Sequence, residues 1–176
     1  MIKTDRLVLR KFQISDAAEA LHNSQRPNVA HFMSDMVLPD EEAATKWIEW
    51  INSRFSYDEP FIAFAIVLEE TQTCFGLIAL APKEELNGEV EIVFSIADEY
   101  QGKGYATEAG KAIIEWGFSN CELDYIVAIV KLDNIASMRV IEKLGFQRIE
   151  QRIIEYDGTP TAFEYYRLYN EYKIID

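Results

Sequence analysis

Hydrophobic positions along the chain alternate with charged ones or gather in short runs, and this pattern predicts seven β-strands. The first, over residues 6–12, alternates apolar and charged residues as a half-buried strand does. The run over 125–130 is apolar throughout, which places it in the middle of a sheet with both faces covered. The other strands are predicted over 61–68, 74–81, 90–97, 146–156 and 163–169, with a turn over 157–160.

Four stretches with cap residues or helical spacing predict helices between the strands. Ser15 and Asp16 are typical N-cap residues for a short helix that ends near Asn23. The others are predicted from Pro39 to Phe55, from Thr107 to Phe118, and from Asn134 to Leu144 before Gly145. This order, β-α-α-β-β-β-α-β-α-β-β, predicts an α/β (α+β) fold with a mixed sheet and helices on its faces. From the length of 176 residues we expect a single domain over 1–176.

The charge balance is strongly acidic, with a net charge of −13 and a pI near 4.6. Such a surface repels the phosphates of nucleic acids, so we expect no nucleic-acid partner. The acidity either serves solubility or attracts a cationic substrate, such as an amine or a basic polypeptide. Aromatic residues such as Phe32 and Trp47 either line a substrate cleft or belong to the core.

The sequence gives no support for a membrane or metal role. The longest apolar run, over 61–68, is too short to span a bilayer, and no signal-peptide pattern is found, so we expect a cytoplasmic protein without a membrane partner. Cys74 and Cys121 have no metal-ligand spacing, and His22 and His31 have no third ligand nearby in the sequence. We therefore expect reduced thiols and no metal.

A glycine-rich turn joins the strand predicted over 90–97 to the helix predicted from Thr107. Its glycines allow a tight turn that points backbone N–H groups outward, and the start of the helix adds unpaired N–H groups with a partial positive charge. Such a site binds phosphate or pyrophosphate. The residues expected to form it are Gln101, Gly102, Lys103, Gly104, Tyr105, Ala106 and Thr107.

A second motif follows this turn after one strand. The turn matches the pattern Gln/Arg-x-x-Gly-x-Gly/Ala, and the second motif matches Asn-x-x-Ser/Ala-x-x-x-x-x-x-x-Gly-Phe. The matching residues are Gln101, Gly104 and Ala106 in the first, and Asn134, Ser137, Gly145 and Phe146 in the second. Together they resemble the two acetyl-CoA-binding motifs of the GNAT acetyltransferase superfamily, and the resemblance extends from Thr4 to about Tyr169. The opening Thr-Asp-Arg-Leu-Val-Leu-Arg resembles the branch that includes ribosomal-protein N-terminal acetyltransferases.

The resemblance implies an acetyl-CoA-dependent N-acetyltransferase whose mostly antiparallel sheet has about seven strands. The strand before the turn would splay from the next one and bind the pantetheine arm through its backbone. Lys103 would add charge to the phosphate site or be a solvated turn lysine, and Arg139 would reach the cofactor or form a surface salt bridge. Asn134 would cap its helix, hold the arm or do both. The strand residues that would contact the arm are Phe94, Ser95 and Ile96, opposite 128–130.

The resemblance also implies catalytic candidates. Glu91 falls where many family members have a glutamate, and it is either a base or water-positioning group or a solvated strand carboxylate. Glu89 shares its face of the strand. Many members have a tyrosine that acts as the general acid where this chain has Ile141. Ser137 therefore becomes the candidate acid; the alternative is that it is a small residue packed against the cofactor. A thiol with a pKa of about 8.5 leaves readily without a strong acid.

The acceptor is expected to be a primary amine, on a protein N-terminus or a small molecule. At neutral pH, deprotonation costs about 1.4 kcal/mol for an α-amine and about 4.6 kcal/mol for a lysine, which favours the α-amine weakly. The helix predicted over 40–55 and the turn near Asp157 would wall the acceptor site, and we expect a monomer or a homodimer. The missing tyrosine leaves an alternative, a catalytically degenerate CoA-binding sensor or interaction module. Dinucleotide binding is disfavoured because Thr107 stands where a third glycine is required.

Overall fold

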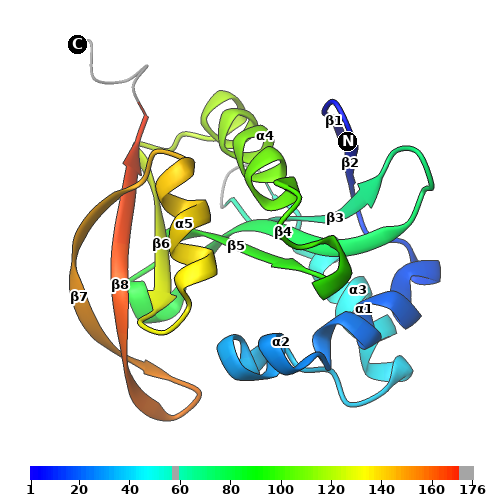
Figure 1. Cartoon of the computed structure of the whole chain (residues 1–176), viewed down its shortest axis with the longest axis horizontal. Helices are drawn as coiled ribbons and strands as arrows, with labels where there is room; N and C mark the ends of the chain where they lie inside the picture. Colours follow the sequence, from blue (N-terminus) through cyan, green and yellow to red (C-terminus); the bar gives the residue numbers. More distant parts are fainter. Residues whose placement is uncertain (57–59, 171–176) are drawn as a thin grey trace.

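The computed structural model describes residues 1–56 and 60–170, and eight strands of this part of the chain form one sheet. The strand order is β1-β2-β3-β4-β5-β6-β8-β7, and all neighbouring strands are antiparallel except β5 and β6 (Figure 1). The strands are β1 (Ile2–Lys3), β2 (Leu7–Arg10), β3 (Ile62–Leu68), β4 (Cys74–Lys83), β5 (Glu89–Ile96), β6 (Tyr125–Lys131), β7 (Gln147–Tyr156) and β8 (Thr159–Tyr169). The predicted mixed sheet is confirmed, with the short edge strand β1 added to the seven expected strands. The domain predicted over 1–176 includes residues 57–59 and 171–176, which lie outside the described residues.

The helices follow the predicted order, with one addition. They are α1 (Ala17–Ser24), α2 (Pro27–Phe32), α3 (Glu41–Ser53), α4 (Tyr105–Asn120) and α5 (Ile135–Lys143), with short 3-10 turns η1 (Ile14–Asp16), η2 (Ser34–Met36), η3 (Glu84–Leu86) and η4 (Asp98–Tyr100). The sequence pattern missed α2, whose first turn holds Pro27, where a missing N–H breaks no helical hydrogen bond. The Asp40 side chain caps α3 by accepting a hydrogen bond from the Ala43 N–H at 2.8 Å. α4 begins at Tyr105, before the predicted start.

Side chains alternate between the two faces of the sheet, and helices cover both (Figure 1). On one face, Ile113 of α4 and Ile141 of α5 pack with strand residues such as Ile78 in the larger core. On the other, Ile48 of α3 packs with strand residues such as Ala65. Burying this apolar area on both faces is the main force that holds the layers together.

β5 and β6 separate almost as soon as they meet. Within the described residues, their ladder consists of one pair, Glu91 with Val127. β6 lies between β5 and β8 in the sheet, which confirms the central position predicted for 125–130. Beyond the single pair the two strands diverge like the arms of a V, as the predicted splay requires (Figure 1).

The turn between β7 and β8 is tighter than predicted. Asp157 and Gly158 have φ angles of 50° and 70°, left-handed values that glycine adopts freely and aspartate tolerates in two-residue hairpin turns. Thr159 and Pro160, which were expected in the turn, begin β8 instead. Pro160 lies beyond the part of β8 that pairs with β6, so its missing N–H interrupts no ladder with that strand.

Candidate active site

Glu91 lies at the vertex of the V, where it pairs with Ala81 on β4 and with Val127 on β6. Only 7% of the residue is exposed, so it is not a solvated strand carboxylate. Burial raises the pKa of Glu91 to about 7, while the Lys83 ammonium and the backbone N–H of Ile129 act in the opposite direction. At neutral pH a large fraction of this carboxyl is ionised and able to accept a proton.

The edge of β5 that faces the gap has backbone groups that do not pair with β4. The Ala97 N–H donates to the Phe75 carbonyl on β4 at 2.9 Å, and hydrogen-bonded pairs alternate along an antiparallel ladder. The backbone groups of Phe94 and Ile96 therefore point away from β4 and into the gap, whereas those of Ser95 point toward β4. The backbone groups of Phe94 and the N–H of Ile96 are thus placed to pair with a peptide-like ligand, and Ser95 offers its side chain.

The facing edge on β6 follows from the same alternation. The Asn170 N–H donates to the Asp124 carbonyl at 2.8 Å, next to the ladder between β6 and β8. The backbone groups of Ile129 therefore point away from β8, toward β5 and the Glu91 carboxyl. Both arms of the V present backbone hydrogen-bonding groups to the space between them.

The glycine-rich turn stands at the end of β5 and opens α4. Gly102 and Gly104 have φ angles of 73° and 84°, which explains the need for glycine there. Gly104 is the N-cap of α4, and no side chain caps this helix, so its first N–H groups stay available to an anion. The Gln101 Nε2 donates to the Ile96 carbonyl at 2.9 Å and fixes the turn to the end of β5.

The beginning of the chain holds this turn in place, a role that sequence reasoning missed. The Glu108 carboxylate on α4 accepts hydrogen bonds from the Thr4 hydroxyl at 2.6 Å and from the Arg6 Nε at 2.8 Å. The Arg6 Nη1 also donates to the Lys103 carbonyl at 3.1 Å, and its guanidinium lies 4.4 Å from the centre of the Tyr105 ring. Burial raises the pKa of Glu108, but these hydrogen bonds outweigh it and keep that pKa below its usual value. Thr4 and Arg6 of the Thr-Asp-Arg opening therefore hold the turn and the start of α4 in place through long-range contacts.

The gap, the turn and α5 enclose a cleft of about 760 Å³. Nearly all of the predicted site residues line it: Glu91, Phe94, Ser95, Ile96, Gln101, Gly102, Gly104, Tyr105, Ala106, Thr107, Asn134, Ser137 and Arg139. The exception is Lys103, whose Nζ lies 5.4 Å from the centre of the Tyr100 ring. The predicted residues come from three separate segments, and the fold brings them to one cavity.

Helix α5 supplies the side of the cleft opposite β5. The Asn134 side chain caps this helix, accepting a hydrogen bond from the Ser137 N–H at 3.1 Å. Arg139 is exposed along the cleft. Ile141 is only 1% exposed and belongs to the core, and its side chain cannot donate a proton.

We call the part of the cleft lined by α2, η2, α3, β3 and β4 its α3 side. Phe32 and Trp47, the aromatic residues singled out in the sequence, both line it, and Trp47 also packs against the core. The Ser34 hydroxyl donates to the Asp157 carboxylate at 3.0 Å, so η2 is tied to the turn between β7 and β8. Residues of α3 line the cleft and Asp157 does not, and that the two elements wall an acceptor site stays a prediction.

A polar cluster in the cleft was missed by sequence reasoning. The Tyr156 hydroxyl donates a hydrogen bond to the Asp35 carboxylate, and burial together with this contact raises the pKa of Tyr156 above its usual value. The ammonium groups of Lys83 and Lys131 lie 5.6 and 4.7 Å from the centre of the same ring. Asp35 and Tyr156 are 121 residues apart, so no local pattern could have paired them.

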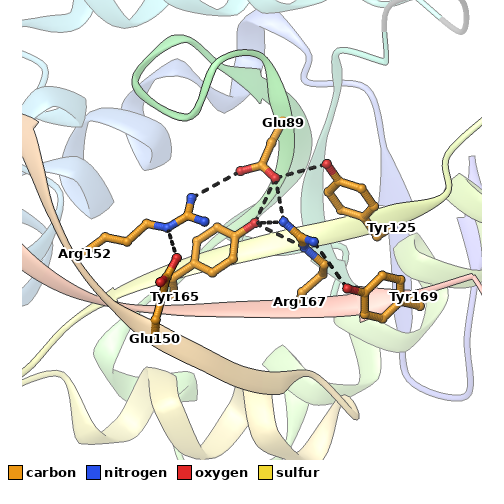
Figure 2. A network of polar contacts seen from close by, with 7 residues as sticks. All are labelled: Glu89, Tyr125, Glu150, Arg152, Tyr165, Arg167 and Tyr169. Atoms are coloured by element: carbon orange, nitrogen blue, oxygen red, sulfur yellow. Dashed lines mark hydrogen bonds and ion pairs between the residues drawn. The ribbon is translucent and has the colours of Figure 1, made fainter.

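A network around Glu89 fastens β5 to the neighbouring strands just before the vertex. Its carboxylate accepts hydrogen bonds from the hydroxyls of Tyr125 on β6 and Tyr165 on β8, at 3.1 and 2.8 Å (Figure 2). It also contacts the guanidinium groups of Arg167 at 3.0 Å and Arg152 at 3.5 Å (Figure 2). These side chains cross three strands and hold the base of the V, where the backbone ladder supplies a single pair.

Glu89→Gln is expected to lower the free energy of unfolding by about 2 kcal/mol, because two arginines in a partly buried site lose their shared carboxylate. Urea unfolding followed by circular dichroism measures this value. Glu150→Gln is the matched control, since Glu150 contacts Arg152 at 2.7 Å in the same network and its side chain is 51% exposed. Its effect should stay below about 0.5 kcal/mol. Equal losses in both variants would contradict a specific role for Glu89.

Three further observations concern metal binding, membrane spans and the two cysteines. Among residues 1–56 and 60–170, no group of three or more His, Cys, Asp or Glu side chains is placed to hold a metal ion. In the same part of the chain, no helix combines the length and apolar character needed to cross a membrane. Cys74 and Cys121 are both free and buried.

Comparisons with known proteins agree with this architecture. The family model of the acetyltransferase (GNAT) domain matches residues 6–147. A Bacillus licheniformis protein named "Uncharacterized N-acetyltransferase p20" is 30% identical over 145 residues, covering 82% of this chain and 81% of the relative. The crystal structure of a GNAT-family acetyltransferase from Bacillus anthracis superposes with a TM-score of 0.79 at 25% identity, covering 96% of this chain and 97% of that one. Mycobacterium smegmatis RimJ, solved in complex with CoA-disulfide, shares the fold with a TM-score of 0.77 at 17% identity, covering 95% of this chain and 83% of its own. This chain belongs to the GNAT family of acetyltransferases.

Proposed function

We propose that this protein is an N-acetyltransferase that moves the acetyl group of acetyl-CoA to a primary amine, on a small molecule or at a protein N-terminus. One observation carries the proposal: a buried glutamate with a pKa of about 7 stands at the vertex of a V-shaped gap. From this vertex the gap leads along unpaired strand edges to an uncapped helix N-terminus. A carboxyl poised near neutral pH is what general base catalysis requires.

The residues along the gap fit coenzyme A part by part. The open N–H groups of the turn from Gly102 to Tyr105 and the start of α4 suit a pyrophosphate. The backbone groups of Phe94 and the N–H of Ile96 can pair with the amide groups of a pantetheine arm, as an added strand would. When bound, acetyl-CoA supplies an activated acyl group. The complex of Mycobacterium smegmatis RimJ with CoA-disulfide is an example of a protein of the same fold that holds a coenzyme A derivative.

Glu91 is placed to take the proton of the attacking amine. An α-amine has a pKa of about 7.7–8.0, so a carboxylate with a pKa near 7 can accept its proton at a cost of about 1 kcal/mol. A lysine amine, with a pKa of about 10.4, would be several kcal/mol harder to deprotonate. At a given pH, an amine of lower basicity therefore reacts more readily than a more basic amine bound in the same way, and orientation of both reactants in the cleft supplies much of the remaining acceleration.

No strong acid is needed on the opposite side. Ile141 is apolar and buried where many relatives were expected to have a tyrosine. A thiol with a pKa of about 8.5 leaves as thiolate at neutral pH with little assistance. Ser137 lines the cleft and is the candidate to donate a hydrogen bond to the departing sulfur.

The test combines binding and turnover. Purified protein is expected to bind acetyl-CoA in calorimetry and to release free thiol when acetyl-CoA is mixed with a panel of primary amines and short peptides. Binding without thiol release for any acceptor would favour the alternative function, a CoA-binding sensor. Absence of acetyl-CoA binding would contradict both.

A further inference from the structure

The floor of the α3 side is built from small apolar side chains. On β4, Ala79 pairs with Ala63 of β3 and with Val93 of β5. One row further, Ala81 pairs with Glu91. Paired residues on neighbouring strands have Cβ atoms about 4.5–5.5 Å apart and on the same face. An alanine side chain is a single methyl group, and Ala63, Ala79, Ala81 and Glu91 all line the same cleft.

Large aromatic and flexible apolar side chains stand around this floor. Trp47 and Trp50 of α3 line it, and the Trp50 ring lies 5.3 Å from that of Phe61 in an edge-to-face contact. Trp50 is 51% exposed, which is unusual for a tryptophan that could pack inward. Met33 and Met36 line the opposite side, and methionine adapts its shape to different apolar ligands.

A smaller cavity of about 40 Å³ continues this apolar surface. It shares Met33, Met36, Trp47 and Leu77 with the cleft and reaches Phe12. Its volume exceeds that of a water-sized void, but its lining is mostly apolar and offers few partners to water. An apolar group that enters from the cleft can extend into it.

The charges of the cleft do not suit an acceptor with several positive charges. Beside Glu91, the described acidic residue that lines it is Asp35, which accepts a hydrogen bond from Tyr156 and lies 3.9 Å from the Lys83 ammonium. Lys83 and Lys131 add positive charge next to the same tyrosine. A polyamine needs several free carboxylates to pair with its ammonium groups. An ammonium group without a carboxylate would lose its hydration without a compensating ion pair, and this weakens binding.

We infer that the acceptor is a primary amine attached to a bulky apolar group, such as an aryl or branched alkyl group. The amine faces Glu91, and the apolar group lies on the alanine floor between α3 and η2. This inference rests on the proposed function and adds the substrate class. The net charge of −13 then serves solubility, since the cleft itself is largely apolar.

The first experiment compares kcat/KM for free amines and peptides with acetyl-CoA. The arms are 2-phenylethylamine, isopentylamine, ethylamine and spermidine, and tripeptides that begin with Phe, Lys or Asp. The apolar amines should exceed both ethylamine and spermidine by about tenfold or more, since one buried methylene changes kcat/KM by about tenfold or more. The peptide arms show whether the apolar group belongs to a free amine or to an N-terminal residue. A value for spermidine equal to or above that of the apolar amines would overturn the inference.

Two variants test the alanine floor and the Trp50 side chain that lines the same cleft. Ala79→Leu fills the floor and should lower kcat/KM for 2-phenylethylamine about tenfold more than it lowers kcat/KM for ethylamine. Ala162→Leu makes the same change at an exposed position of β8 outside the cleft and should change neither. Trp50→Ala, at a half-exposed position, is the second variant, and it should lower kcat/KM for 2-phenylethylamine in the same way. Unchanged selectivity in both cleft variants would contradict the inference.

Binding measured without turnover separates this inference from the proposed function. Titration of the CoA-loaded protein should change its tryptophan fluorescence with 2-phenylethylamine and not with spermidine, because Trp47 and Trp50 line the site. This result would support the substrate class even if thiol release failed. The reverse preference would refute the class while acetyl-CoA binding and turnover still supported the acetyltransferase activity.

Discussion

Glu91→Gln is expected to lower kcat at pH 7 by about 10²–10⁴-fold, the usual loss when a positioned general base is removed. Glutamine has nearly the same shape as glutamate, and position 91 does not line the turn that suits the pyrophosphate. The Kd of acetyl-CoA should therefore stay within about twofold of the original value, or about 0.4 kcal/mol. Steady-state kinetics and calorimetry measure the two quantities. Glu122→Gln, at an exposed position outside the cleft, is the control and should change neither.

The dependence of kcat/KM on pH should report the ionisation of Glu91. A base must be deprotonated to act, and burial holds the pKa of Glu91 at about 7, so kcat/KM should rise with pH through that value. The acceptor amine adds a second rise near its own pKa, about 7.7–8.0 for an α-amine. In Glu91→Gln only the amine rise should remain. A profile that keeps both rises in the variant would show that another group is the base.

Stability should change in the opposite sense to activity. The pKa of Glu91 is raised from 4.5 to about 7, so the folded state favours the protonated carboxyl. The contribution of the Glu91 carboxyl to the free energy of unfolding is therefore fully present below its unfolded pKa of about 4.5, and it is lost as the pH rises through about 7. Glu91→Gln carries no such ionisation, and above pH 8 it should be more stable by up to about 3 kcal/mol, a difference that vanishes near pH 4. Urea unfolding at both pH values tests this, and a less stable variant at high pH would contradict it.

Gly104→Ala is expected to weaken acetyl-CoA binding by about tenfold or more, equal to about 1.4 kcal/mol. Gly104 has a φ of 84°, and a residue with a Cβ is strained there by about 1–2 kcal/mol. Relief of this strain moves the turn and misdirects the N–H groups at the start of α4, each of which can form a hydrogen bond to phosphate worth about 1.5–3 kcal/mol. Calorimetry with acetyl-CoA measures the loss.

The control for this variant has nearly the same backbone strain at another place. Gly88 has a φ of 82° in the turn before β5, and an added Cβ there meets no atom within 4 Å. Gly88→Ala should lower the free energy of unfolding about as much as Gly104→Ala and leave the Kd of acetyl-CoA unchanged. If both variants weakened binding equally, loss of stability rather than the turn would be the cause.

The predicted elements and the observed ones agree where periodicity is long and differ where tertiary contacts decide. The apolar runs became β3, β4, β5 and β6 because burial on two faces requires continuous hydrophobic residues. The short helix α2 was missed since its six residues show no helical period of their own. Pro160 was assigned to a turn, and it lies in β8, where pairing with β7 overrides its local preference.

The candidate site also combines residues that local motifs predict with contacts that only the packing of distant segments produces. The residues of the two motifs come together at the cleft, because each motif occupies a turn or helix start next to the gap between β5 and β6. Glu91 was identified by its match to the family pattern, but its burial and its raised pKa depend on the strands around it. Tyr156, Asp35 and the Glu89 network join segments that are far apart in the chain, and no pattern within one segment predicts such partners.

Local patterns in the sequence were enough to set the order of the strands and helices other than β1 and α2, the position of the glycine-rich turn, and the family. These properties depend on local spacing: alternation for strands, glycine for left-handed turns, and an open N-terminus for helix α4. Long-range packing was needed to establish that β5 and β6 share a single pair, that Glu91 is buried at their vertex, and that alanines form the floor beside it. Strand pairing between distant segments sets which side chains surround a carboxyl, and those neighbours fix both its pKa and the shape of the space that an amine can occupy.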